Sequence, residues 1–241
     1  SLVYRNEDGT HFVEGSRALH LDTIYNAMNF ELLDLDHSGN PSLYITQIHK
    51  MTHRERYPLP SGATRLRFEH LGNTRTLVRN FLLQRHHNGL FHNVHDIRVE
   101  PAEHGWAWDA GTFDYENDGD VDLLVLNGTE TDSLMATGET REQYLGGRVF
   151  MSQHGNQRNV CYLAEEGYFY NVSDRCELSY VGNSRSSAFF DFDNDGDLDV
   201  AINDYRAPAR VFENLQESGN HWIRLHLEGS RSARNAIGAR V

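Results

Sequence analysis

The chain is poor in lysine and in cysteine. Lys50 is the single lysine, so 21 (22 − 1) of the 22 basic residues are arginine. Genome composition, adaptation to high salt and planar pairing of arginine with carboxylates each account for this bias, and the sequence does not separate them. Cys161 and Cys176 are the two cysteines, and they flank a hairpin expected over 162–175. This arrangement predicts a disulfide in an oxidising compartment and two buried thiols elsewhere.

Long apolar runs, basic patches and common catalytic signatures are also missing. No stretch of about 18 apolar residues exists, so we expect no membrane-spanning helix. The formal net charge is −13, and this overall balance argues against a nucleic-acid surface. Nucleophile elbows, phosphate-binding glycine loops and zinc-ligand spacings are absent. No signal peptide is visible, and we expect the natural N-terminus to lie upstream.

What the chain does contain is a run of alternating carboxylates over 191–199, Asp-Phe-Asp-Asn-Asp-Gly-Asp-Leu-Asp. In calcium loops, side chains at positions 1, 3 and 5 converge on one ion, and a backbone carbonyl at position 7 adds a ligand. A carboxylate at position 9 completes the shell here, and Gly196 at position 6 permits the sharp turn. Residues 200–202, Val-Ala-Ile, are apolar and read as a strand rather than a helix, so we predict a calcium loop that enters a strand.

The same frame occurs twice more, at 114–122 and, in degraded form, at 34–42. The loops start 80 (114 − 34) and 77 (191 − 114) residues apart. We expect calcium in the loops at 114 and 191, and weak or no binding at 34, because fewer anionic ligands bind calcium less tightly. The candidate calcium ligands are Asp191, Asp193, Asp195, Asp197, Asp199, Asp114, Glu116, Asp118, Asp120, Asp122, Asp34, Asp36, Ser38, Asn40 and Ser42.

Other features keep the same period. Turns that combine glycine and phenylalanine occur at 9–12, 89–91 and 167–169. Short apolar strands are expected at 2–4, 81–83, 149–151 and 211–212. Several short strands in a unit of this length predict an all-β β-propeller or solenoid, in which each unit buries its face against its neighbours.

These motifs carry a family resemblance. The acidic loops that enter strands, separated by glycine-phenylalanine turns, resemble the FG-GAP/VCBS repeats of β-propellers. Residues 105–114, Gly-Trp-Ala-Trp-Asp-Ala-Gly-Thr-Phe-Asp, look like the approach to the calcium loop in the cartilage-acidic-protein-like family. Residues 220–229 and 235–241 look like the start of the ASPIC/UnbV domain that follows the repeats there. The resemblance covers nearly the whole chain apart from about 50–80.

The resemblance implies a calcium-stabilised propeller with FG-GAP/VCBS-type blades over 1–215 and the start of an ASPIC/UnbV-like domain over 216–241. It implies a secreted, cell-surface or periplasmic module for cell adhesion, recognition or structure. The expected partner is an extracellular protein or a carbohydrate, with self-assembly as a further expectation. Three to four units fall short of about six to eight blades. We therefore expect an incomplete ring or fragment, the alternative being a ring completed by another chain.

Two other functions stay open. Some propellers of this type are carbohydrate lyases or dehydratases with His, Tyr and Arg at the central funnel, although no such arrangement is legible here. The other alternative is a subunit of a surface assembly or filament. Extensive contacts between chains would favour the assembly, and a deep pocket ringed by His, Arg and Tyr would favour the enzyme.

Several further residue groups have a structural and a functional interpretation. His86, His87, His92 and His95 are expected to be solvated turn residues, with a transition-metal site as the alternative. Trp106 and Trp108 are expected to pack between sheets, with sugar stacking as the alternative. The arginine-rich segment 50–76 is expected to pair with the protein's own carboxylates, with binding of anionic sugars or of an acidic subunit as the alternative.

Overall fold

A computed structural model describes most of the chain. It describes residues 3–22, 24, 27–47, 80–100, 102, 106–128, 157–230 and 234–236. Within them the fold consists of antiparallel sheets and one short helix, α1 (His95–Arg98), so the predicted all-β class is confirmed. Helix α1 has four residues, and the described part of the chain holds no helix long and apolar enough to cross a membrane. The predicted strand at 149–151 and the arginine-rich segment 50–76 lie outside the described residues.

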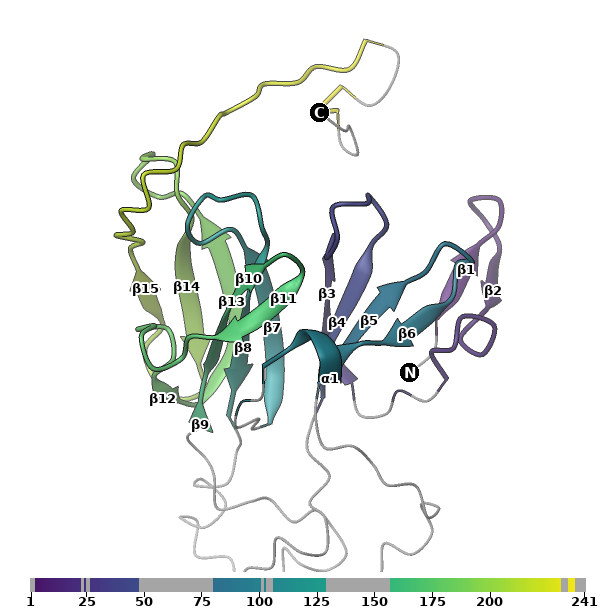
Figure 1. Ribbon diagram of the computed structural model, residues 1–241, viewed down its shortest axis with the longest axis horizontal. Coiled ribbons are helices and arrows are strands. Elements are labelled where there is room, and N and C mark those ends of the chain that lie inside the picture. The colour runs from purple at the N-terminus through teal and green to yellow at the C-terminus, as the bar shows by residue number, and fades with distance from the viewer. Residues whose placement is uncertain are drawn as a thin grey trace, which may run out of the picture.

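Two four-stranded sheets form the centre of the molecule (Figure 1). The first has the order β3-β4-β5-β6, and the second has the order β7-β8-β10-β11. Their strands are β3 (Ala27–Leu33), β4 (Ser42–Gln47), β5 (Phe81–Arg85), β6 (Phe91–Asn93), β7 (Ala107–Phe113), β8 (Asp122–Asn127), β10 (Val160–Glu165) and β11 (Tyr168–Asn171). Each consecutive pair is antiparallel.

Smaller sheets flank these two. A three-stranded sheet of order β13-β14-β15 lies beside the second sheet, and two-stranded sheets are formed by β1-β2 and β12-β9. Their strands are β1 (Tyr4–Asn6), β2 (Phe12–Glu14), β9 (Gln157–Arg158), β12 (Val181–Gly182), β13 (Ser184–Phe190), β14 (Asp199–Asp204) and β15 (Arg210–Phe212).

The three hairpins β3-β4, β7-β8 and β13-β14 have corresponding registers. In each, the residue before the acidic loop faces the ninth loop residue: Leu33 faces Ser42, Phe113 faces Asp122 and Phe190 faces Asp199. In each, the pairing is irregular near the start of the first strand: between Ala27 and Phe30, Ala107 and Asp109, and Ser184 and Ser186. The hairpins therefore present their loops in the same way relative to the strands.

Strand β8 shows how the sheets are held together. All six of its residues are buried, which is typical of a strand covered on both faces. Because successive side chains point to opposite faces, Leu123 and Val125 join the core shared with the first sheet, including Tyr44. Leu124 and Leu126 join the core shared with the third sheet.

A half-buried carboxylate connects the first strands of the three sheets. Strand β7 lies between β3 and β13. Asp109 on β7 accepts hydrogen bonds from Asn29 Nδ2 on β3 and, at 2.8 Å, from the Ser187 amide on β13. Burial raises the pKa of Asp109 above its usual range. Burial, and then the charge of Asp109, raise the pKa of Glu31 as well.

The predicted disulfide is present. Cys161 lies on β10 and is bonded to Cys176, with the two Cα atoms 6.5 Å apart. Strands β10 and β11 form the expected hairpin, in which Tyr162 is opposite Asn171. The disulfide joins β10 to the segment that follows β11, so this hairpin is closed covalently.

Candidate metal centre

The three acidic loops lie at the same end of their sheets (Figure 1). Loop 34 (residues 34–42) joins β3 to β4, loop 114 (residues 114–122) joins β7 to β8, and loop 191 (residues 191–199) joins β13 to β14. The ninth residue of each loop is also the first residue of the following strand, and all three are buried: Ser42, Asp122 and Asp199. The predicted passage from acidic loop directly into strand is confirmed for all three.

The loops also share a backbone conformation. Position 4 has a positive φ in each: 51° at His37, 55° at Asn117 and 66° at Asn194. Position 6 is the left-handed glycine: Gly39 at 75°, Gly119 at 96° and Gly196 at 97°. Residues other than glycine adopt this region at a cost, and asparagine does so more readily than most. Loop 34 has therefore kept the turn geometry although its sequence has lost carboxylates.

A shared hydrogen bond fixes the middle of each loop. The position-5 side chain accepts from the position-7 amide: Ser38 Oγ from Asn40 at 3.2 Å, Asp118 Oδ1 from Asp120 at 2.8 Å and Asp195 Oδ1 from Asp197 at 3.2 Å. Turns of this kind are typical of Asp, Asn and Ser. They hold the side chain at position 5 toward the inside of the loop.

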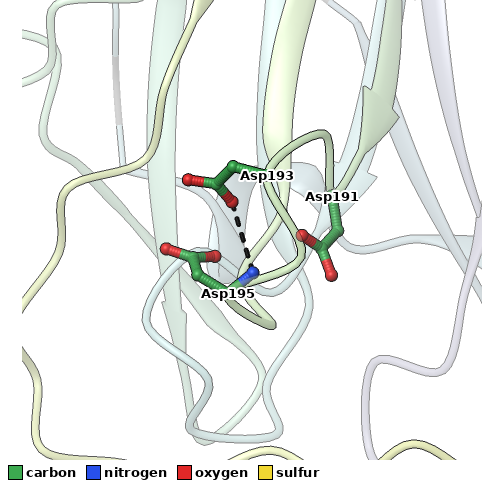
Figure 2. A group of neighbouring side chains, drawn as sticks. All are labelled: Asp191, Asp193 and Asp195. Atoms are coloured by element: carbon green, nitrogen blue, oxygen red, sulfur yellow. Dashed lines mark hydrogen bonds between the residues drawn. The ribbon is translucent and has the colours of Figure 1, made fainter.

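Loop 191 brings three predicted ligands together. One carboxylate oxygen from each of Asp191, Asp193 and Asp195 lies within 4.8 Å of the other two. Figure 2 shows the three side chains on one turn, with the Asp195 amide donating to Asp193 Oδ1 at 3.3 Å. Among the described residues this is the single group of three acidic, His or Cys side chains gathered so closely.

The same loop contains buried carboxylate oxygens that have no hydrogen-bond partner. Asp191 Oδ1 and Asp197 Oδ1 are both inaccessible to solvent and accept no hydrogen bond. The Asp197 residue as a whole is 7% exposed. Burial, and then the charges of Asp195 and Asp199, raise the pKa of Asp197 to about 6. An unpaired buried carboxylate is costly, and a hard divalent cation with oxygen ligands would remove that cost.

The position-9 aspartates have a second role that the sequence does not reveal. Asp122 accepts from the Tyr115 and Ala164 amides, at 2.6 and 2.8 Å. Asp199 accepts from the Phe192 and Asn214 amides, both at 2.9 Å. Each carboxylate thus ties its own loop to a neighbouring strand or segment, because both of its oxygens hold backbone amides. Any contact with a cation at position 9 would come in addition to these bonds.

Loop 114 has the same frame but a different arrangement of charges. Asp114 accepts from the Asp118 and Gly119 amides, at 3.0 and 2.9 Å. Glu116 Oε2 is buried without a hydrogen-bond partner, and burial, then Asp118, raise the pKa of Glu116. Burial also raises the pKa of Asp122 to about 8. The predicted ligands of this loop are present, with their carboxylates spread more widely than those of loop 191.

Loop 34 is linked to its neighbours. The Gly39 amide donates to Asp34 Oδ2 at 2.6 Å, and Gln84 Nε2 on β5 donates to Asp36 Oδ2 at 3.0 Å. His37 Nε2 lies 2.7 Å from Asp120 Oδ1 of loop 114. Loop 34, which has the fewest carboxylates, therefore also serves as a contact between the first and second sheets.

The C-terminal tail, residues 213–230, is a part of this end of the molecule that sequence analysis missed. Ser218 Oγ and Asn220 Nδ2 donate to the Glu116 carbonyl, at 2.8 and 3.0 Å. Arg224 Nη2 donates to Asp191 Oδ2 at 2.7 Å. Apolar and polar residues alternate over 223–228 as they do in a strand, but the structure has no strand there. This pattern does not indicate which surface the tail contacts.

The remaining candidates fit structural roles. Trp106 is buried, as expected, and Trp108 is partly buried beneath the Arg185 guanidinium, 4.3 Å from its ring centroid. His86, His87 and His92 are exposed, and the rings of His86 and His92 lie with their centroids 4.5 Å apart near the turn between β5 and β6. The prediction of a solvated turn residue is wrong for His95, which is the first residue of α1 and is buried. A cavity of about 200 Å³ lies against the disulfide, and its walls are mostly apolar.

No protein-family model matches the chain, and no curated protein matches it. The resemblance to FG-GAP/VCBS repeats and to the ASPIC/UnbV domain therefore stays a prediction carried by the motifs quoted above. The function is therefore inferred from the carboxylates of the three acidic loops.

Proposed function

We propose that this chain is a calcium-binding segment of an extracellular β-propeller, used for adhesion, recognition or structural support. The observation that carries the proposal is the convergence of Asp191, Asp193 and Asp195 within 4.8 Å. Buried, unpaired oxygens on Asp191 and Asp197 accompany it. The loop offers oxygen ligands alone, which favours a hard cation over zinc or copper.

Calcium fits this donor set better than magnesium. Ca²⁺ accepts six to eight oxygens in flexible geometry, whereas Mg²⁺ demands a near-ideal octahedron and keeps several waters. Asp191, Asp193 and Asp195 would hold the ion through their side chains, and position 7 would add its carbonyl. The ion would supply positive charge that offsets the carboxylates, so that binding and folding would be coupled.

The propeller assignment is supported by the way in which the sheets stack. Three hairpins of matching register stand side by side, with β7 between β3 and β13. The outer face of β3 carries exposed apolar side chains, among them Phe30 at 61% and Leu32 at 58%. Apolar sheet faces are normally covered, and in a propeller a further blade covers them. The lyase and assembly alternatives gain no specific support from the described residues.

The proposal is tested by thermal unfolding in calcium and in excess chelator. At about 100 times the dissociation constant, a ligand that binds the native state alone stabilises it by about 2.7 kcal/mol. We therefore expect a clear rise in melting temperature with Ca²⁺, and a smaller one in Asp193→Asn, which loses a ligand. Glu165→Gln makes the same charge change at an exposed position on β10 and should respond like the parent protein. An identical melting curve in calcium and chelator would refute the proposal.

A further inference from the structure

The tail approaches two loops with different chemistry. It leaves β15 and crosses the end of the sheets that carries the loops (Figure 1). At loop 114 it uses the neutral donors Ser218 and Asn220, and both bind the Glu116 backbone carbonyl. At loop 191 it presents a charged side chain, because Arg224 binds the Asp191 carboxylate at 2.7 Å.

The contact with loop 191 has an apolar part as well. The Trp222 indole lies directly on Gly196, so closely that a Cβ placed on this glycine would be 1.7 Å from the ring. A bare Cα–H face is therefore required at position 6 both for the turn and for the indole. Trp222 is 48% exposed, and its covered face is the one against the loop.

Arg224 and a cation draw on the same carboxylate. Asp191 Oδ2 holds the guanidinium, while Asp191 Oδ1 is buried and unpaired. Asp197, 7% exposed, adds a second unpaired oxygen. A divalent ion bound to Asp191 would place two positive charges beside the guanidinium and reduce the negative charge that attracts it. Like charges so close repel, and they do so more strongly where the surroundings exclude water.

We propose that the tail is a built-in competitor for the cation of loop 191. Arg224 pairs with Asp191 when the tail is docked, and cation binding displaces Arg224 and lifts Trp222 from Gly196. Loop 114 lacks this competition, because Asp114 accepts backbone amides and the tail meets this loop through neutral groups. The inference rests on the proposed calcium site and adds its regulation: cation binding undocks the tail.

The first test measures Ca²⁺ binding by titration calorimetry in an Asp118→Asn background, which weakens loop 114 so that loop 191 dominates. Binding and docking that oppose each other must do so reciprocally. We expect Arg224→Gln to tighten calcium binding about tenfold, within the range usual for such coupling. Arg234→Gln removes a charge from an exposed pair with Glu228 and should leave the affinity unchanged.

The second test follows Trp222 itself by acrylamide quenching, taken as the difference between the parent protein and Trp222→Phe. We expect this difference signal to become more quenchable when Ca²⁺ is added and to change little when Mg²⁺ is added. The proposed competition is wrong if Arg224→Gln weakens calcium binding or leaves it unchanged. It is also wrong if calcium binds but leaves the quenching of Trp222 unaltered. In either case the calcium site itself stands. Absence of calcium binding in both the parent protein and Arg224→Gln overturns the site and the competition together.

Discussion

Gly119 and Gly196 hold equivalent positions and the same conformation, yet their surroundings differ. Their φ angles are 96° and 97°. A Cβ on Gly119 would meet nothing within 4 Å, whereas one on Gly196 would collide with Trp222. The two glycines therefore allow the cost of the backbone conformation to be separated from the cost of losing the tail contact.

Alanine at each glycine gives different expected results. Gly119→Ala should lower the free energy of unfolding by about 1–2 kcal/mol, the cost of a left-handed residue with a side chain. Gly196→Ala should lower the free energy of unfolding by the same amount and should also displace Trp222 from the loop. The displaced indole should be quenched more strongly by acrylamide. Denaturant unfolding of both variants in chelator checks the energies. Equal quenching of Trp222 in the two variants would show that the indole does not rest on Gly196.

At the scale of the element, the acidic loops couple protons to stability. Burial raises the pKa of Asp122 to about 8 and that of Asp197 to about 6, against an ordinary value of about 3.9. A raised pKa means that the folded state binds more protons than the unfolded chain between the two values. This contribution to stability is complete below about pH 4 and is lost as pH rises through the folded-state pKa.

The melting temperature in chelator should therefore fall between about pH 5 and 8, and Asp122→Asn should flatten that fall. Calcium needs ionised carboxylates, so the stabilisation produced by Ca²⁺ should grow over the same interval. Thermal scans at several pH values, with calcium and with chelator, check both slopes. A calcium effect that is largest at pH 5 would contradict this account.

The sequence predicted the acidic loops and the strands after them because the ligand residues, the turn glycine and the strand follow one another within a few residues. The frame of nine residues predicted loop 191 and the strand that begins at Asp199, because ligands, turn glycine and strand are consecutive. The contact of Arg224 with Asp191 spans 33 residues, and the strand-like alternation over 223–228 does not indicate a contact with a loop. The backbone bonds of Asp122 were hidden for a related reason, since one of its partners, Ala164, lies 42 residues away.

At the scale of the whole molecule, the stack of sheets has a packed contact between the second and third sheets and an exposed apolar face on β3. Phe189 stacks on Phe113 between the second and third sheets, with ring centroids 4.7 Å apart. Phe30 lies on the outer face of β3 and is 61% exposed. Both are phenylalanines on the first strand of a hairpin, so they form a matched pair for testing which faces are covered.

Serine at Phe189 should lower the free energy of unfolding by about 3 kcal/mol, as for other large losses between packed layers. Serine at Phe30 should change it by no more than about 0.5 kcal/mol, as for exposed positions. Urea unfolding of the full chain measures both. A large loss at Phe30 would mean that another sheet, from a further segment or a second copy, covers β3 in solution.

The carboxylate of Asp109 has a geometric consequence. Apolar packing between sheets is non-directional and tolerates a range of tilts, but hydrogen bonds fix distance and angle. Asp109 takes one bond from Asn29 and another from Ser187, so the angular step from the first sheet to the second and from the second to the third is set at one residue. A single carboxylate on β7 therefore helps to set how the stack of three sheets curves.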